Sequence, residues 1–199
     1  MFNFSPRALL LGAGGLVLSG LALLLLGGKG AKPATKMSPG AVAKLRSAEK
    51  LMTHLYNDPA GHATVGVGHL IHLGNANGSE PPGFLKGGLP APGNNTRAPS
   101  PTLSVAEAET LFKTDIAKRE RYVVSQLQVP VSQPQFDAVM SFIYNAGEYR
   151  APLYAAINRG DFEAAATYIA NGPTAGGLAG VITRRAEEAA LFRSGPVLA

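Results

Sequence analysis

The chain has 199 residues, enough for one domain of ordinary size and a short additional segment. It contains no cysteine, which excludes disulfide bonds, thiol catalysis and cysteine-ligated metal sites. The formal net charge of +5 lies almost wholly in residues 1–40, which leaves +1 for residues 41–199 and argues against a nucleic-acid-binding face.

The first feature along the chain is an uncharged stretch of 21 residues, from Ala8 to Gly28. A helix needs about 20 apolar residues to cross the hydrocarbon core of a bilayer, so residues 1–28 are predicted to form a membrane anchor with one transmembrane helix. A cleaved signal peptide is the alternative, but the stretch is long for one and no A-x-A-like site follows. Three lysines come directly after it, and by the positive-inside rule they would keep the following domain in the cytoplasm. The orientation of the anchor therefore stays open.

Residues 29–40 (KGAKPATKMSPG) are polar and contain prolines and glycines, a composition that predicts a linker to a domain spanning residues 41–199. A first helix is expected to begin at Pro39 or Gly40. Apolar residues recur there at helical spacing, namely Val42, Leu45, Ala48, Leu51 and Met52.

A small β-hairpin is predicted after this helix. Asp58-Pro59-Ala60-Gly61 is a turn signal, and residues 64–67 alternate in polarity as a strand does. Residues 74–101 are rich in Gly, Pro and Asn and predict a loop.

The rest of the chain is predicted to be helical. Ser104 and Glu107 have the spacing of a capping box, which opens a long helix through about Gln126. Further helical patterns cover residues 135–145, 152–159, 162–170 and 182–192. The expected fold class is α+β: a mainly helical domain with a small β-hairpin subdomain, preceded by the transmembrane helix.

One string of residues carries most of the functional information. Glu49 is followed by Asp58, Thr64 and His69 in the pattern E-x8-D-P-A-G-x-x-T-x-G-x-G-H. This string resembles the active-site region of the phage-type (T4-like) lysozymes, a family of glycoside hydrolases. Further matches follow in the same order, at residues 141–147, 158–161 and 183–187. The resemblance spans residues 41–193 and implies a lysozyme-like fold and muramidase activity.

Glycoside hydrolysis needs one acid that protonates the leaving oxygen and a carboxylate that acts on the other face of the sugar. The resemblance implies that Glu49 is the general acid, and that Asp58 and Thr64 position the water that attacks the anomeric carbon with inversion. It also implies an arginine in contact with the acid, either Arg184 or Arg185. A cation at that place opposes protonation of a carboxyl group, whereas burial at the end of a helix favours it.

Four further residues, Tyr56, Leu70, Tyr144 and Asn145, fall where family members line the sugar cleft, and they are predicted to bind substrate. Tyr144 fits equally well as a core residue. His69 is expected to hold the hairpin by hydrogen bonds. The other histidines show no metal-ligand spacing, and nothing in the sequence implies a cofactor or a metal.

Together with the apolar segment, the domain resembles the signal-anchor-release endolysins of phages that infect Gram-negative hosts. This resemblance implies a host inner-membrane protein whose catalytic domain lies in the periplasm and is released, as a monomer, on lysis. Its substrate would be peptidoglycan, cut at the β-1,4 bonds between N-acetylmuramic acid and N-acetylglucosamine, with a phage holin acting indirectly.

Two alternatives remain open. One is a muramidase that stays bound to a membrane, such as a virion membrane, and acts at entry. The other is a non-catalytic, membrane-tethered protein that binds the cell wall.

Overall fold

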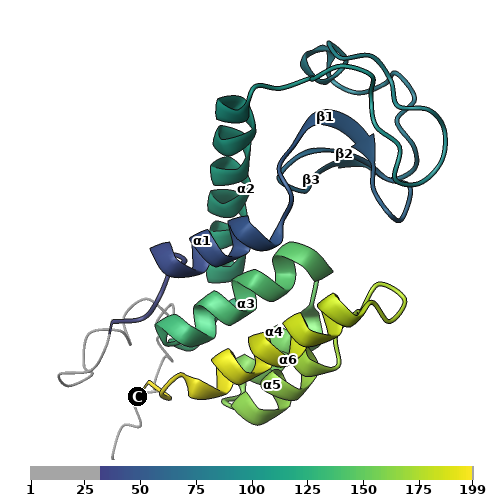
Figure 1. Ribbon diagram of the computed structural model, residues 1–199. Coiled ribbons are helices and arrows are strands. Elements are labelled where there is room, and N and C mark those ends of the chain that lie inside the picture. Colours follow the sequence, from purple (N-terminus) through teal and green to yellow (C-terminus); the bar gives the residue numbers. More distant parts are fainter. Residues whose placement is uncertain (1–31, 199) are drawn as a thin grey trace, which may run out of the picture. The chain divides into compact units, whose positions relative to one another are not determined.

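Six α-helices, a three-stranded sheet and a short 3-10 helix make up residues 32–198, the part of the chain that the computed structural model describes (Figure 1). Their order is α1 (Pro39–Ala48), β1 (Met52–Asn57), β2 (Ala63–Gly66), β3 (His69–His72), η2 (Pro82–Phe84), α2 (Val105–Gln126), α3 (Gln133–Ala146), α4 (Ala151–Asn158), α5 (Phe162–Ala170) and α6 (Ala179–Ser194). The predicted transmembrane helix lies outside the described residues. Within residues 32–198, no helix has both the length and the apolarity to cross a bilayer.

The segment just before α1 lies against the domain. Ala34 and Met37 are buried in the core, and the N–H group of Ala34 donates to the carbonyl of Val131 at 3.0 Å. Ser38 is the N-cap of α1, and its hydroxyl donates to the carboxylate of Asp137 at 2.7 Å. Residues 34–38 of the predicted linker therefore belong to the folded domain.

Helix α1 ends just before Glu49. Glu49 is the C-cap residue, with an extended backbone (φ −94°, ψ 125°), and its N–H donates to the carbonyl of Leu45. The prediction of a helix that continues through Leu51 and Met52 is wrong, since Met52 opens β1 and pairs with Gly66 of β2. Glu49 thus lies at a junction between helix and strand.

The predicted hairpin is part of a three-stranded antiparallel sheet with the order β1-β2-β3. Tyr56 of β1 pairs with Thr64 of β2, and Thr64 pairs with Leu70 of β3. Gly66 and Gly68 have φ values of +67° and +69°. This left-handed backbone, which glycine adopts without strain, lets the chain reverse between β2 and β3.

Helix α3 forms the centre of the helical part (Figure 1). Residues 135–140 and 142–144 of α3 are all buried, because α1, α2 and α6 pack around this helix. Helix α5 packs between α4 and α6. Helix α2 contacts both the sheet and α3, so it connects the two parts of the domain. Its predicted capping box is confirmed: Ser104 and Glu107 each satisfy the other's backbone N–H group.

A buried carboxylate organises the loop after β3. Glu80 accepts hydrogen bonds from the N–H groups of Asn77 and Gly78, both at 2.9 Å, and a further bond joins its Oε1 to His72 Nε2 at 2.9 Å. Burial opposes ionisation of Glu80, but these hydrogen bonds outweigh it, and the pKa of Glu80 lies below its ordinary value. Hydrogen bonds to the Leu73 carbonyl and to Glu80 raise the pKa of His72.

The raised pKa of His72 predicts that the domain loses stability as the pH rises from about 6.5 through the pKa that His72 has in the folded protein. A histidine whose pKa is higher in the folded than in the unfolded protein stabilises the fold. This stabilisation is complete below about pH 6.5, the ordinary pKa of histidine, and it is lost as the pH rises through the pKa of the folded state. The pKa of Glu80 is lowered, so its contribution is lost only on acidification. We expect His72→Gln to lower the Tm by about 1–3 °C at pH 5.5 and by less at pH 8.5, as for a partly exposed ion pair. Thermal unfolding at both pH values measures this, and an equal effect at both would contradict it.

Candidate active site

Glu49 is held by an arginine from the far end of the chain. Arg184 Nη1 on α6 donates to Glu49 Oε1 at 2.7 Å, and the two side chains are 17% and 20% exposed. Of the two candidate arginines, the structure therefore places Arg184 against the predicted acid. A Cβ atom on Gly68 would lie 3.7 Å from Glu49 Oε2. The turn between β2 and β3 thus reaches the second carboxylate oxygen, and the missing side chain leaves room beside it.

Arg184 is fixed from three directions. Its Nη2 donates to the Ser141 carbonyl at 3.2 Å and its Nε donates to Glu188 Oε1 at 3.0 Å, in addition to the bond with Glu49. Burial lowers the pKa of Arg184, but the hydrogen bonds and the charges of Glu49 and Glu188 outweigh this effect and raise it above its ordinary value. Arg184 is therefore a permanent cation beside the predicted acid.

Asp58 lies in the turn between β1 and β2. Its Oδ1 accepts hydrogen bonds from the N–H groups of Ala60 and His62, both at 2.8 Å, which fixes the side chain. Among the hydrogen bonds of residues 32–198, none uses Asp58 Oδ2. Thr64 is buried, and its hydroxyl donates to the His62 carbonyl at 3.0 Å. That bond leaves the oxygen of Thr64 able to accept.

Tyr56 of β1 interacts with each of the three predicted catalytic residues, through charge or through strand pairing. Burial and the charges of Asp58 and Glu49 raise the pKa of Tyr56 to about 12, so both carboxylates lie within electrostatic reach of its hydroxyl. Tyr56 is also the cross-strand partner of Thr64. Tyr56 thus pairs with Thr64 across the sheet and responds to the charges of Asp58 and Glu49.

The other predicted substrate-binding residues differ in what they can offer. Leu70 is exposed on β3. Tyr144 is buried, and its hydroxyl donates to the Val67 carbonyl at 2.6 Å, so that group is engaged within the protein. Burial and the charge of Asp115 raise the pKa of Tyr144. Asn145 is exposed, and its Oδ1 accepts a hydrogen bond from Arg185, whereas no hydrogen bond among residues 32–198 uses its amide nitrogen.

Comparison with known families assigns the chain to a family. The phage lysozyme family model matches residues 46–188, which include all three predicted catalytic residues. The chain belongs to the phage lysozyme family. Membership assigns it to the lysozyme-type glycoside hydrolases.

Individual relatives of this phage lysozyme family member are endolysins. The endolysin of Salmonella phage P22 is 27% identical over 163 residues, which cover 80% of this chain and 99% of the relative. The endolysin of Bacillus phage PZA is 35% identical over 103 residues, which are 49% of this chain and only 40% of that relative. The chain therefore spans well under two thirds of the Bacillus phage endolysin.

Solved structures support the lysozyme-like fold. A mutant of P22 lysozyme has a TM-score of 0.53 at 25% identity and covers 80% of this chain and 99% of its own. The muramidase domain of SpmX from Asticaccaulis excentricus has a TM-score of 0.54 at 25% identity and covers 79% of this chain and 97% of its own. The mainly helical lysozyme-like fold is thus confirmed, with a three-stranded sheet in place of the predicted hairpin.

One charged residue of the candidate site, Glu188, is not among those predicted from the sequence. Glu188 binds both Arg184 and Arg185, and it also accepts a hydrogen bond from the hydroxyl of Ser141. It stands four and three residues after the two arginines, the spacing at which oppositely charged side chains meet on a helix. That spacing could have revealed it.

His69 has the structural role expected for it. A hydrogen bond of 2.8 Å joins its Nδ1 to Asp115 Oδ2 and thus joins β3 to α2. The ring of Phe84, from η2, packs against it with a centroid distance of 5.9 Å.

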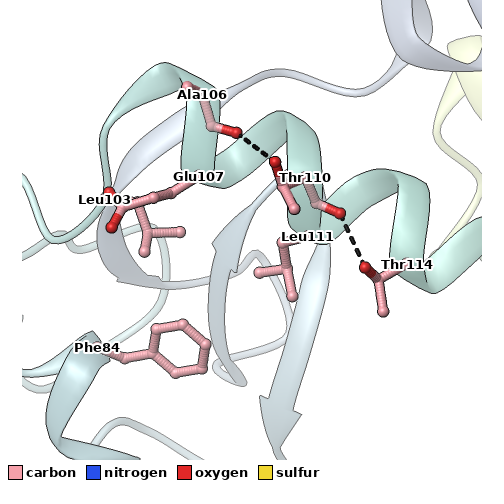
Figure 2. A pocket seen from close by; sticks show the side chains of 7 residues that line it. All are labelled: Phe84, Leu103, Ala106, Glu107, Thr110, Leu111 and Thr114. Atoms are coloured by element: carbon pink, nitrogen blue, oxygen red, sulfur yellow. Dashed lines mark hydrogen bonds between the residues drawn. The ribbon is translucent and has the colours of Figure 1, made fainter.

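A separate pocket of about 400 Å³ lies between η2 and the N-terminal half of α2 (Figure 2). Its walls are mostly apolar and include Phe84, Leu103 and Leu111. The hydroxyls of Thr110 and Thr114 point back to carbonyls one turn earlier, at 2.8 and 2.9 Å, so their protons are engaged. None of the predicted catalytic residues lines this pocket.

Proposed function

We propose that the protein is a phage endolysin that hydrolyses the β-1,4 bond between N-acetylmuramic acid and N-acetylglucosamine in host peptidoglycan and so causes lysis. The observation that carries this proposal is the ion pair of Glu49 with Arg184, next to a sheet whose turn fixes Asp58 and whose strand β2 carries Thr64, in a member of the phage lysozyme family. The similarity to P22 endolysin over nearly its whole length supports the lytic role.

In the proposed reaction, Glu49 donates its proton to the glycosidic oxygen as the bond to the anomeric carbon breaks. A water held by Asp58 Oδ2 and the Thr64 oxygen attacks that carbon from the opposite face, and Asp58 takes the proton that the water loses. The sugar product leaves with inverted configuration. The fixed turn around Asp58 and the engaged hydroxyl proton of Thr64 support this division of roles.

Inversion predicts that the first product is the α-anomer. Soluble, uncrosslinked glycan strands would be digested with the full chain and followed by proton NMR before the anomers equilibrate. The α-anomeric signal should appear first. A β-anomer at early times would contradict inversion, and the absence of any new reducing end would contradict the proposed activity itself.

The apolar stretch from Ala8 to Gly28 is the membrane anchor in this proposal. It holds the domain on the periplasmic side of the host inner membrane until the membrane is depolarised, an event to which a phage holin contributes indirectly. Fractionation before and after depolarisation tests this, with movement from the membrane to the soluble fraction expected. Retention in the membrane would favour the permanently bound, virion-associated alternative, and a shortened N-terminus would show a cleaved signal.

A further inference from the structure

The predicted acid belongs to a cluster of four charged side chains, Glu49, Arg184, Arg185 and Glu188, and neither Arg185 nor Glu188 has a role in the reaction above. Resting on the proposed function, we propose that Glu188 is a positioning residue: it shares Arg184 with Glu49 and thereby sets the pH range in which Glu49 keeps its proton. Within residues 32–198, Glu188 forms hydrogen bonds with Ser141, Arg184 and Arg185, none of which is a predicted sugar contact. It acts through Arg184.

Both oxygens of Glu188 are engaged. Oε1 accepts hydrogen bonds from Arg184 Nε at 3.0 Å and from Ser141 Oγ at 2.7 Å, and Oε2 accepts from Arg185 Nη1 at 2.6 Å. The Glu188 side chain is 4% exposed and that of Arg185 is 1% exposed. A carboxylate that accepts from three donors and has almost no contact with solvent is held in one position.

Arg184 divides its hydrogen bonds between two carboxylates. Nη1 donates to Glu49 and Nε donates to Glu188. Arg184 and Arg185 are balanced by Glu49 and Glu188, so the cluster is neutral when Glu49 is ionised. Without the charge of Glu188, Glu49 would be the only anion in a cluster with two cations, which favours its ionised form. Without the charge of Arg185, Glu188 would offset Arg184 more fully, and Glu49 would hold its proton to higher pH.

The other titratable or charged groups near Glu49 do not offset the charge of Arg184 as Glu188 does. Tyr56 from β1 and Tyr144 from α3 are neutral at the pH of the reaction, because burial raises the pKa of both. Asp58 lies in the turn after β1. Arg46, on α1, pairs with Glu109 at 2.6 Å, and its Nη1 reaches the backbone carbonyl of Glu49 at 3.4 Å. These groups are unchanged when Glu188 or Arg185 is substituted.

Two substitutions in the full-length protein therefore have opposite expected effects. For Glu188→Gln, the alkaline limb of the kcat/KM profile on peptidoglycan should move to lower pH, on the order of one unit for a charge at this range. For Arg185→Gln it should move to higher pH. KM should change little for Glu188→Gln, because Glu188 contacts none of the predicted sugar-binding residues, whereas it should rise for Arg185→Gln, because Arg185 holds the predicted substrate-binding residue Asn145. A purely structural role would lower activity in both variants without shifting the limb in opposite directions.

The double variant with both substitutions removes one charge of each sign and leaves no buried arginine without a partner. Its alkaline limb should return close to that of the wild type. Ile157→Ala, a buried and uncharged change on α4, is the control for lost stability and should leave the limb in place. Thermal unfolding shows which variants are folded at the assay temperature.

Opposite shifts, reversed in the double variant, would establish the role of Glu188. No shift, or shifts of the same sign, would overturn it. If Glu188→Gln does not fold, the other two variants decide the question. The alkaline limb should then move to higher pH in Arg185→Gln and return close to the wild-type position in the double variant, and any other result would overturn the proposal. An inactive wild type would instead contradict the proposed function, so the two failures are distinguishable.

Discussion

Replacement of Glu49 by glutamine is expected to slow peptidoglycan cleavage by about 10²–10⁴-fold, the usual contribution of a positioned acid. An amide has nearly the shape of a carboxyl group and its oxygen can still accept the hydrogen bond from Arg184, but it has no acidic proton for the leaving oxygen. The loss should therefore appear in kcat. The measurement is the rate of reducing-end release by the full chain and its variant.

Glu109→Gln is the matched control for this experiment. Glu109 is a partly exposed carboxylate on α2 that pairs with Arg46 close to the end of α1, so it also neutralises a charge near the site. The activity of the Glu109→Gln variant should stay within about twofold of that of the wild type, because a surface ion pair contributes little. A Glu49→Gln variant that kept more than a tenth of the wild-type rate would show that another group donates the proton.

Asp58→Asn is expected to lower kcat by a similar factor, about 10²–10⁴, because an amide cannot accept the proton that the attacking water loses. The asparagine oxygen can still accept from the N–H groups of Ala60 and His62, so the turn should keep its shape. KM should therefore change little. Steady-state kinetics on soluble glycan strands separates the two parameters.

Asp161→Asn is the corresponding control. Asp161 is the N-cap of α5 and accepts a hydrogen bond from the N–H of Ala164 at 3.0 Å, much as Asp58 accepts hydrogen bonds within its turn. It differs from Asp58 in its place in the fold, at the start of a helix that carries none of the predicted catalytic residues. This variant should cleave at the wild-type rate. If Asp58→Asn also cleaved at that rate, the water would have to be activated by a different residue.

The helices could be predicted well because their signals are local. The capping box of Ser104 and Glu107 and the apolar spacing along α2 to α6 lie within each helix. Strand β1 was missed because Leu51 and Met52 continue the apolar spacing of α1, while its pairing with β2 depends on the tertiary fold. The residues of the segment before α1 looked like a linker because their partners, Val131 and Asp137, are about a hundred positions away.

The candidate site could be predicted in part for the same reason. Glu49, Asp58 and Thr64 stand in one short string, whereas the choice between Arg184 and Arg185 depends on how α6 packs. Neighbouring residues on a helix point in directions about 100° apart, so only one of the two can face Glu49. The other, Arg185, turns inward to the Pro173 carbonyl and the Phe142 ring.

The most direct test of the proposed muramidase reaction is the chemical identity of the new ends in digested peptidoglycan. Purified Gram-negative peptidoglycan would be treated with the full chain, reduced with borohydride and analysed by mass spectrometry. Hydrolysis by Glu49 and a water held at Asp58 should produce N-acetylmuramitol at every new end. Ends made of 1,6-anhydro-N-acetylmuramic acid, which form without addition of water, or of reduced N-acetylglucosamine would contradict this account.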